Sequence, residues 1–462
     1  MDKLIKNGTV VTACDEFKAD IHVKDGKIEA VGRELSVPGA RVLDAAGMYV
    51  LPGGIDQHVH FSFEYKGSRV RGFETSPAAA VGGTTTVIEF VNQQQGKGLL
   101  ESMEEYKTAW AEGKARVDYN FHGVLTDPRD EVFGEMDDLV AAGYTTIKLF
   151  MAYKGMFFHA DDDAILKALK AARKAGITIM VHAENADAID VLQKELVAAG
   201  KTDPYYHAVS RPPLVEAEAT RRAIYLARMA EAPLYVVHVS CREAMEEIRQ
   251  ARTAGLPVFG ETCSHYLVLD ESCLARPGFE GAKFVCSPAL RTPEHQDALW
   301  EALNLGWLNA VSSDHCGFDW KNQKHMGRDS FVNIPNGAPG MENRLPVLWT
   351  YGVETGKISR QKLVDLYATS PAKNTGIDHC KGRIAVGYDA DMVIFDPAWR
   401  GIMSAQRSLH GVDFTPYEGM EQKGRPRQVL LRGEIIVDNG EYVGEGVPGR
   451  QVKGKPYGNS YR

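Results

Sequence analysis

Cysteines and long apolar runs are the scarcest features of this sequence of 462 residues. Its seven cysteines are odd in number and scattered, and no two of them form a CxxC pair. We therefore expect reduced thiols in a cytoplasmic protein. No apolar run approaches the ~18 residues that a membrane-spanning helix needs. The first residues, MDKLIKNGTVVTACDEF, contain no long apolar segment, so we expect no secretion signal.

Positive charge is also in short supply. The formal net charge is −8, which gives no electrostatic reason to bind nucleic acid or an anionic membrane surface. No GxGxxG motif opens a helix after the first strand, so the fingerprint of the dinucleotide-binding fold is missing. Hydrophobic residues make up 44% of the chain and charged residues 25%, which is the composition of an ordinary globular protein.

Both ends of the chain are rich in short strands and turns. Residues 4–32 contain Asn7-Gly8 and Asp25-Gly26, two dipeptides typical of β-hairpins. The same pattern of short strands and turns occurs near the other end, in GRIAVGYDADMVIFDP (382–397) and RQVLLRGEIIVDNGEYVG (427–444). We expect the two ends to pair into one small β-sandwich that flanks a continuous central domain.

The central part of the chain alternates between strands and helices. Its apolar, strand-like runs are TTTVIEF (84–90), DYNFHGVL (118–125), YTTIKLF (144–150), ITIMVHA (177–183), LYVVHVS (234–240) and LNAVSSD (308–314). Stretches with helical apolar spacing lie between them, namely DDDAILKALKAARKAG (161–176), EAEATRRAIYLARMAEA (216–232) and REAMEEIRQARTAG (242–255). This alternation favours parallel β/α architecture, and a (β/α)8 barrel fits the length better than an open sheet.

The predicted domain organisation follows from these two patterns. We place the N-terminal part of the β-sandwich at residues 1–52, the (β/α)8 catalytic barrel at 53–375 and the C-terminal part of the sandwich at 376–448. Residues 449–462 are polar and basic and form an extended tail, which is either disordered or lies on a neighbouring subunit.

Polar side chains occur where the apolar strands of the predicted barrel end. In LPGGIDQHVHF (51–61), His58 and His60 share one face of a strand, because alternate side chains point the same way. Other strands end in His182, His238 and Asp314. A single histidine of this kind is more often a hydrogen-bonded core residue. Together, four imidazoles and a carboxylate at the C-terminal mouth of one barrel need a cation or hydrogen bonds, which favours zinc, with manganese or iron as alternatives.

Lys148 is the unusual member of this pattern, because it lies among the apolar residues of YTTIKLF. Burial and nearby cations both favour its neutral amine. A neutral amine reacts with carbon dioxide, and the resulting carbamate is an anion whose two oxygens can bridge two metals. The alternative is a lysine that reaches solvent or pairs with a carboxylate. Beside the histidines we prefer the carbamate.

Six motifs together resemble the amidohydrolase superfamily, and more narrowly its dihydropyrimidinase and hydantoinase branch. They are PGGIDQHVH, GYTTIKLFMAYKG, VHAEN, VVHVS, SSDHC and NIPNGAPGMENRL. The resemblance runs along nearly the whole chain. It implies a binuclear zinc site with two pairs of histidines, a carboxylated lysine and an aspartate as ligands: His58, His60, His182, His238, Lys148 and Asp314. It also implies a homotetramer or a dimer.

The resemblance implies the chemistry as well. A hydroxide bridging the metals would attack a carbonyl of a small cyclic ureide or imide, and the product would be an N-carbamoyl amino acid. Asp314 would accept the hydroxide proton and return it to the departing ring nitrogen. Tyr153 in KLFMAYKG would contact the substrate carbonyl, while Ser287 in FVCSPALR and Asn336 in NIPNG would bind the ring.

The substrate is the least determined part of this interpretation. Dihydroorotase-like relatives carry an arginine two residues after the second histidine to hold a carboxylate, and here that position is Ser62. An anionic ring is therefore disfavoured. Several aromatic residues either line a pocket for a ring substituent or merely pack under loops: Phe61, Phe63, Tyr65, Phe157 and Phe158. A 5-substituted hydantoin and dihydrouracil both fit.

Two rival functions remain open. The first is allantoinase, the same chemistry on a ureido-substituted ring. The second is a non-catalytic assembly protein on this fold, like the collapsin response mediator proteins, which lack the full ligand set. All six expected ligands are present here, and this counts against the second rival.

Overall fold

Eight parallel strands form the barrel at the centre of the computed structural model, which describes residues 2–458. In chain order the strands are β8 (Gly54–His60), β11 (Thr84–Asn92), β12 (Asp118–Val124), β13 (Thr146–Phe150), β14 (Thr178–His182), β15 (Leu234–Val236), β16 (Val258–Cys263) and β17 (Ala310–Ser312). Each pairs in parallel with the next. Directly after β17, β18 (His315–Cys316) pairs in parallel with β8 and closes the ring. The predicted (β/α)8 barrel is confirmed.

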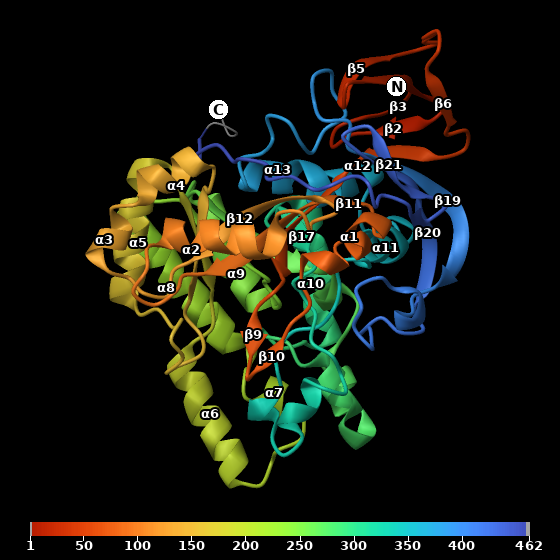
Figure 1. Ribbon diagram of the computed structural model, residues 1–462. Helices are drawn as coiled ribbons and strands as arrows, with labels where there is room; N and C mark the ends of the chain where they lie inside the picture. The colour runs from red at the N-terminus through yellow and green to blue at the C-terminus, as the bar shows by residue number, and fades with distance from the viewer. Residues whose placement is uncertain (1, 459–462) are drawn as a thin grey trace.

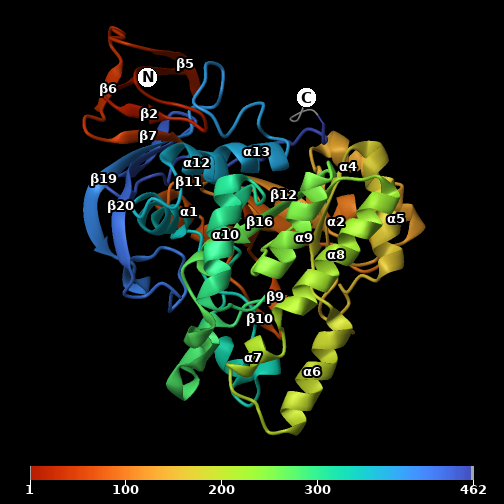
Figure 2. The same cartoon turned by 180° about the vertical axis from the view of Figure 1, so that it is seen from behind.

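Helices surround the barrel on the outside (Figures 1 and 2). The longer ones are α2 (Leu99–Tyr106), α4 (Met136–Ala142), α5 (Asp162–Ala175), α6 (Ala186–Ala198), α8 (Pro213–Ala230), α9 (Arg242–Thr253) and α10 (Pro293–Leu305). The shorter ones are α1 (Pro77–Val81), α3 (Asp130–Phe133), α7 (Tyr206–Val209), α11 (Arg344–Val347), α12 (Arg360–Val364) and α13 (Ser370–Asn374). The three helices predicted from apolar spacing are α5, α8 and α9. Over residues 2–458, no helix has the length and apolar character needed to span a bilayer.

Strand β16 was not among the apolar runs picked out by the sequence pattern. Its sequence, VFGETC, carries Glu261 and Thr262 in fully buried positions. Polar residues interrupt the apolar run by which a buried strand is recognised, so hydropathy alone does not reveal it. This strand supplies a carboxylate to the functional site described below.

The strands from both chain ends form a β-sandwich beside the barrel, as predicted. One sheet has the order β22-β21-β20-β19-β7-β2-β3, with β2 (Thr9–Val11), β3 (Glu16–Lys18), β7 (Tyr49–Pro52), β19 (Met392–Ile402), β20 (Glu421–Leu431), β21 (Glu434–Asp438) and β22 (Glu441–Tyr442). The other has the order β5-β4-β1-β6, with β1 (Lys3–Lys6), β4 (Asp20–Lys24), β5 (Lys27–Gly32) and β6 (Arg41–Asp44). Figures 1 and 2 show the red N-terminal and blue C-terminal strands side by side. Buried residues such as Ile5, Ile21 and Leu430 form their shared core.

One of the two predicted N-terminal hairpins is present. Asp25-Gly26 joins β4 to β5, and both residues have positive φ (49° and 78°), as a two-residue hairpin turn requires. The prediction of a hairpin at Asn7-Gly8 is wrong, because β1 and β2 belong to different sheets. Asn7 has a φ of 65°, and its turn carries the chain from one sheet to the other. A turn dipeptide predicts a reversal of the backbone, but it does not determine which strands pair with each other.

The tail runs across the end of the barrel at which its strands begin. The backbone around Gln451 bridges Tyr119 near the start of β12, and the N–H of Tyr457 donates to the Gly176 carbonyl at 2.7 Å. The part of the tail up to residue 458 therefore lies against its own barrel. The last four residues, 459–462, fall outside the described part of the chain.

At the end of the barrel where the tail lies, a buried lysine connects the barrel to the segment that leads into β19. Nζ of Lys381 lies 2.6 Å from Asp118, 2.9 Å from Asp389 and 2.6 Å from Asp391, and all four side chains are buried. Asp118 belongs to β12, whereas Asp389 and Asp391 precede β19. The Lys381 ammonium thus contacts three carboxylates from two parts of the fold, while the more exposed Lys27 and Arg450 also pair with Asp389.

Replacing Lys381 by methionine is expected to lower the stability of the protein strongly. The change keeps the volume but leaves the carboxylates of the cluster without this partner, and breaking a buried ion pair costs ~3–5 kcal/mol. Denaturant and thermal unfolding would measure the loss. The control is Lys357→Met, which removes an exposed lysine 3.3 Å from Asp297. Equal stability of the two variants would show that the cluster is not a structural anchor.

Candidate metal centre and active site

Three of the predicted ligands meet at the mouth of the barrel. One ligand atom each from His58, His60 and Asp314 lie within 4.8 Å of one another. Oδ1 of Asp314 is 3.3 Å from Nε2 of His58 and 3.2 Å from Nε2 of His60. The histidines end β8 and the aspartate follows β17, so neighbouring strands bring the three together.

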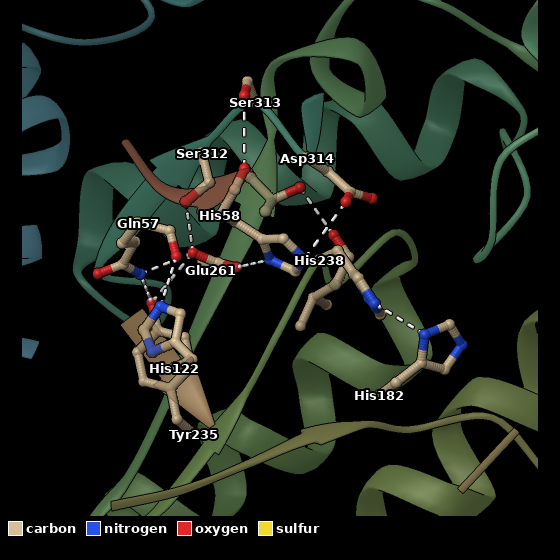
Figure 3. Close-up of polar contacts among 12 residues, drawn as sticks. Gln57, His58, His122, His182, Tyr235, His238, Glu261, Ser312, Ser313 and Asp314 are labelled. Carbon is tan, nitrogen blue, oxygen red and sulfur yellow. Dashed lines mark hydrogen bonds and ion pairs between the residues drawn. The ribbon is translucent and has the colours of Figure 1, made fainter. Parts of the chain in front are cut away.

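The second pair of histidines lies next to this group. Nε2 of His238 is 2.9 Å from Nδ1 of His182, and both rings are almost fully buried. The ring centroids of His58 and His238 are 5.4 Å apart. Figure 3 shows His58 between Glu261 and Asp314, with His238 pointing toward His182. The four imidazoles therefore form one continuous cluster.

Lys148 lies on β13 and is completely buried. Its Nζ is 4.8 Å from the ring centroid of Phe90 and 4.9 Å from that of Phe150. Phe90 also packs on His58 and His60, and Phe150 packs on His182. The amine is thus placed among the predicted ligands. Burial lowers the pKa of Lys148 to about 7, so a substantial fraction of the amine is neutral at physiological pH.

The protonation states of the other ligands also suit a cation. Burial lowers the pKa of His58 and His238 well below the usual range, and burial lowers the pKa of His182 as well. Neutral imidazole is the form that ligates metals. Burial opposes ionisation of Asp314, but interaction with His58 and a hydrogen bond from His60 keep the pKa of its carboxyl below the usual value. The site therefore presents neutral nitrogen donors and a carboxylate.

Unsatisfied polar atoms indicate that the residues fit a divalent metal. Within residues 2–458, neither Nζ of Lys148 nor Nε2 of His58 has a hydrogen-bond partner, although both are buried. Buried polar groups are normally paired, so such atoms call for an explanation. Metal coordination satisfies the imidazole nitrogen directly, and carboxylation of the amine would turn Lys148 into an anionic ligand.

Two buried carboxylates that the sequence analysis did not single out orient the histidines. Oε1 of Glu261 accepts a hydrogen bond from Nδ1 of His58 at 2.6 Å, and Oε2 of Glu184 accepts one from Nε2 of His182 at 2.6 Å. Glu184 also accepts from Nη1 of Arg211 at 2.7 Å. A carboxylate on the far ring nitrogen fixes the tautomer and direction of a metal-binding histidine. The sequence could have indicated Glu184, because it lies two residues after His182. Nothing in the sequence around Glu261 indicates that it contacts a histidine.

Replacing Glu261 by glutamine is expected to weaken metal binding ~10- to 100-fold, the usual effect of losing such a partner. The carboxylate also accepts from Gln57 at 2.6 Å and from Ser312 at 2.5 Å, and an amide cannot accept all these hydrogen bonds. Competition against a chelator would measure the affinity. The control Ser312→Ala removes one donor but keeps the carboxylate, and its loss should be smaller. Wild-type affinity in Glu261→Gln would exclude the orienting role.

The three predicted substrate contacts lie together. Burial raises the pKa of the Tyr153 hydroxyl, and the nearby side chains of Ser287 and Asn336 partly offset this effect. Tyr153 and Asn336 also line a cavity of about 170 Å³ together with His207 and Arg211. Tyr153 is half-buried and lies next to the second histidine pair, since its ring centroid is 5.4 Å from that of His182.

A second buried lysine joins the two loops that carry these contacts. Nζ of Lys324 donates to the carbonyls of Val285 at 2.9 Å and Pro335 at 2.7 Å. Val285 precedes Ser287 by two residues, and Pro335 directly precedes Asn336. This lysine was also absent from the predicted site, because its role depends on a contact between two distant loops.

Three site residues have a backbone conformation that is rare for residues other than glycine. The φ angles are 62° for Tyr153, 40° for His238 and 49° for Asp314. Such conformations cost ~1–3 kcal/mol and persist only where the surrounding structure enforces them, most often at functional sites. The fold therefore holds these three side chains in defined directions.

The aromatic residues near the mouth divide into two groups. Phe61 is completely buried and packs on Phe73 at 5.0 Å between ring centroids, so it belongs to the core. Phe158 packs on Tyr153 at 5.5 Å, and Phe157 is 55% exposed. Residues 157 and 158 thus lie beside the substrate contacts.

Comparisons with known proteins agree with this geometry. The model of the amidohydrolase family matches residues 49–436. A D-hydantoinase from Geobacillus stearothermophilus is 48% identical over 461 residues, which cover 99% of this chain and 98% of the relative. A D-hydantoinase from Ralstonia pickettii is 47% identical, over 99% and 100% of the two chains. The crystal structure of a dihydropyrimidinase from Brevibacillus agri NCHU1002 superimposes with a TM-score of 0.97 at 45% identity, over 99% and 100% of the chains.

Proposed function

This chain belongs to the amidohydrolase family, and within it to the dihydropyrimidinase and hydantoinase group, and we propose that it opens the rings of 5-substituted hydantoins and dihydropyrimidines to N-carbamoyl amino acids. It is a cyclic amide hydrolase. The observation that carries the proposal is the cluster of His58, His60 and Asp314, beside the pair His182 and His238, at the mouth of the barrel.

The proposed cofactor is a pair of divalent metal ions, with zinc preferred. Its ligands are the two histidine pairs, the aspartate and a carboxylated lysine: His58, His60, His182, His238, Asp314 and Lys148. When bound there, the pair supplies an activated water molecule and polarises the scissile carbonyl. Nitrogen and oxygen donors of this kind suit zinc, with manganese and iron as the alternatives.

The protein side chains divide the remaining work. The pKa of Asp314 lies below its usual value, so the side chain is ionised and can accept a proton. It accepts the proton of the attacking water and delivers it to the ring nitrogen as the carbon–nitrogen bond breaks. The water oxygen stays on the carbonyl carbon, which becomes a carboxylate. The Tyr153 hydroxyl donates a hydrogen bond to the carbonyl oxygen, where negative charge develops. Ser287 and Asn336 hold the ring beside Tyr153.

The proposed substrates are neutral rings with an apolar substituent. Ser62 is buried at the position where a carboxylate-binding arginine would be needed, and this supports a ring without a carboxylate. Phe157 and Phe158 offer an apolar surface next to Tyr153. Because the two relatives described above are named D-hydantoinases, we propose that this chain prefers the D enantiomer of its hydantoin substrates.

A substrate panel tests this proposal. Hydantoin, D- and L-5-phenylhydantoin, dihydrouracil and allantoin are assayed side by side, with chiral analysis of the products. We expect turnover of the D-hydantoin and of dihydrouracil, with formation of N-carbamoyl products. Preferential turnover of allantoin would instead support the allantoinase alternative, and turnover of none of the rings by metal-loaded protein would refute the proposal.

Several expectations from the sequence stay predictions. They concern the identity of the metal, carboxylation of Lys148, assembly as a homotetramer or a dimer, a cytoplasmic location and the domain boundaries. Elemental analysis of purified protein and light scattering after gel filtration would test the metal content and the assembly state directly.

A further inference from the structure

A second group of metal-ligand side chains overlaps the proposed catalytic centre. One ligand atom each from Cys263, His265 and Asp314 lie within 4.8 Å of one another, and all three residues are buried. Cys263 ends β16, His265 follows two residues later, and Asp314 follows β17 on the neighbouring strand. The catalytic role proposed above uses only the aspartate of this group.

The His265 ring carries a buried nitrogen that nothing satisfies. The side chain is 8% exposed, and its Nε2 has no hydrogen-bond partner in the described part of the chain. Buried polar atoms are normally paired, so this nitrogen calls for an explanation. A neutral imidazole nitrogen is a common metal ligand, and a bound cation would satisfy it.

The Cys263 thiol lies on the interior face of the barrel. Glu261 points inward to His58, and Cys263 is two residues farther along the same strand, so it lies on the same face nearer the mouth. The thiol is free and fully buried. Sulfur beside an imidazole nitrogen and a carboxylate oxygen is a donor set suited to zinc and to softer divalent cations.

We propose that Cys263, His265 and Asp314 form an inhibitory cation site for excess Zn²⁺ or for a thiophilic ion such as Cd²⁺. Binding converts the thiol to a thiolate and releases its proton to solvent, without any redox change. The ion would coordinate a carboxylate oxygen of Asp314. The Asp314 side chain could then no longer carry the proton between the water and the ring nitrogen. The inhibitory effect rests on the function proposed for Asp314, whereas binding of the ion does not.

Cadmium titration of the holoenzyme tests the site. The protein is prepared in a Cys14→Ser background, because Cys14 is the exposed free thiol, and is loaded with its two metals. We expect one further equivalent of Cd²⁺ to bind with the near-ultraviolet absorption of a cadmium–thiolate bond. Turnover should fall ~10²-fold, the scale of a general base, as this equivalent binds.

Matched variants assign the signal to the proposed ligands. Cys263→Ser should lose the absorption band, and His265→Asn should weaken binding of the third equivalent. The control Cys241→Ser removes another fully buried thiol, at the N-cap of α9, and should keep both the band and the inhibition. Inhibition is scored relative to the activity of each variant with two metals.

Two outcomes would overturn the inference, and both can be seen in the protein that carries only Cys14→Ser. One is saturation at two metals without a thiolate band. The other is a thiolate band that grows while the total metal content stays at two, which would mean replacement of a catalytic metal rather than a separate site. Failure of the proposed function would appear differently, as absence of turnover on every ring before any cadmium is added.

Discussion

Lys148→Ala is expected to abolish ring opening, with a loss of at least about 10³-fold in kcat. Lys148 is fully buried between Phe90 and Phe150, and burial lowers its pKa to about 7, which favours the neutral amine that the proposed carboxylation requires. If Lys148 is carboxylated as proposed, the variant would lose an anionic metal ligand and with it the several kcal/mol that metal activation would supply. Steady-state turnover and elemental analysis would measure the two effects.

Rescue by short carboxylates makes this experiment specific. Alanine leaves a cavity next to the metals, so added acetate or propionate should restore part of both metal content and turnover. The matched control is Lys148→Met, which is equally unable to form a carbamate but fills the cavity and should not be rescued. Full activity of Lys148→Ala without any added carboxylate would rule the mechanism out.

Asp314→Asn is expected to give a folded protein with turnover reduced ~10²- to 10⁴-fold, the contribution of a general acid–base group. The substitution keeps the shape and the backbone position but removes the proton acceptor. Asparagine also tolerates the left-handed backbone conformation found here, where φ is 49°. The remaining five ligands should retain most of the metal, so elemental analysis separates loss of proton transfer from loss of metal.

A surface aspartate provides the control for this variant. Asp297 lies on α10 with its side chain 79% exposed, and Asp297→Asn should leave turnover unchanged. Thermal unfolding of both variants would verify that each is folded. A rate near the wild-type value in Asp314→Asn would remove the proton-transfer role and would leave Asp314 as a ligand only.

The sequence could predict much of this architecture because its signals are local. A strand–helix alternation is visible in the apolar spacing of neighbouring residues, and the positions of His58, His60, His182, His238 and Asp314 follow from the ends of strands. Parallel strands in a closed barrel bring such ends together, whatever lies between them in the chain.

The missed elements share a different property. Glu261 and His58 are 203 residues apart, and Lys324 reaches the Val285 carbonyl across 39 residues. The failed hairpin at Asn7-Gly8 has the same origin, because a turn signal does not choose the partner strand. Polar residues within buried strands look like interruptions until their partners are known.

The sequence by itself determined the barrel, the sandwich built from both ends and the family, since each rests on short-range periodicity or on contiguous motifs. Only the tertiary structure decided how the ligands are held: Glu261 and Glu184 behind the histidines, Lys324 between the substrate loops and His265 beside Asp314. The physical reason is that a buried polar group is specified by whichever distant group satisfies it, and that pairing exists only after the chain has folded.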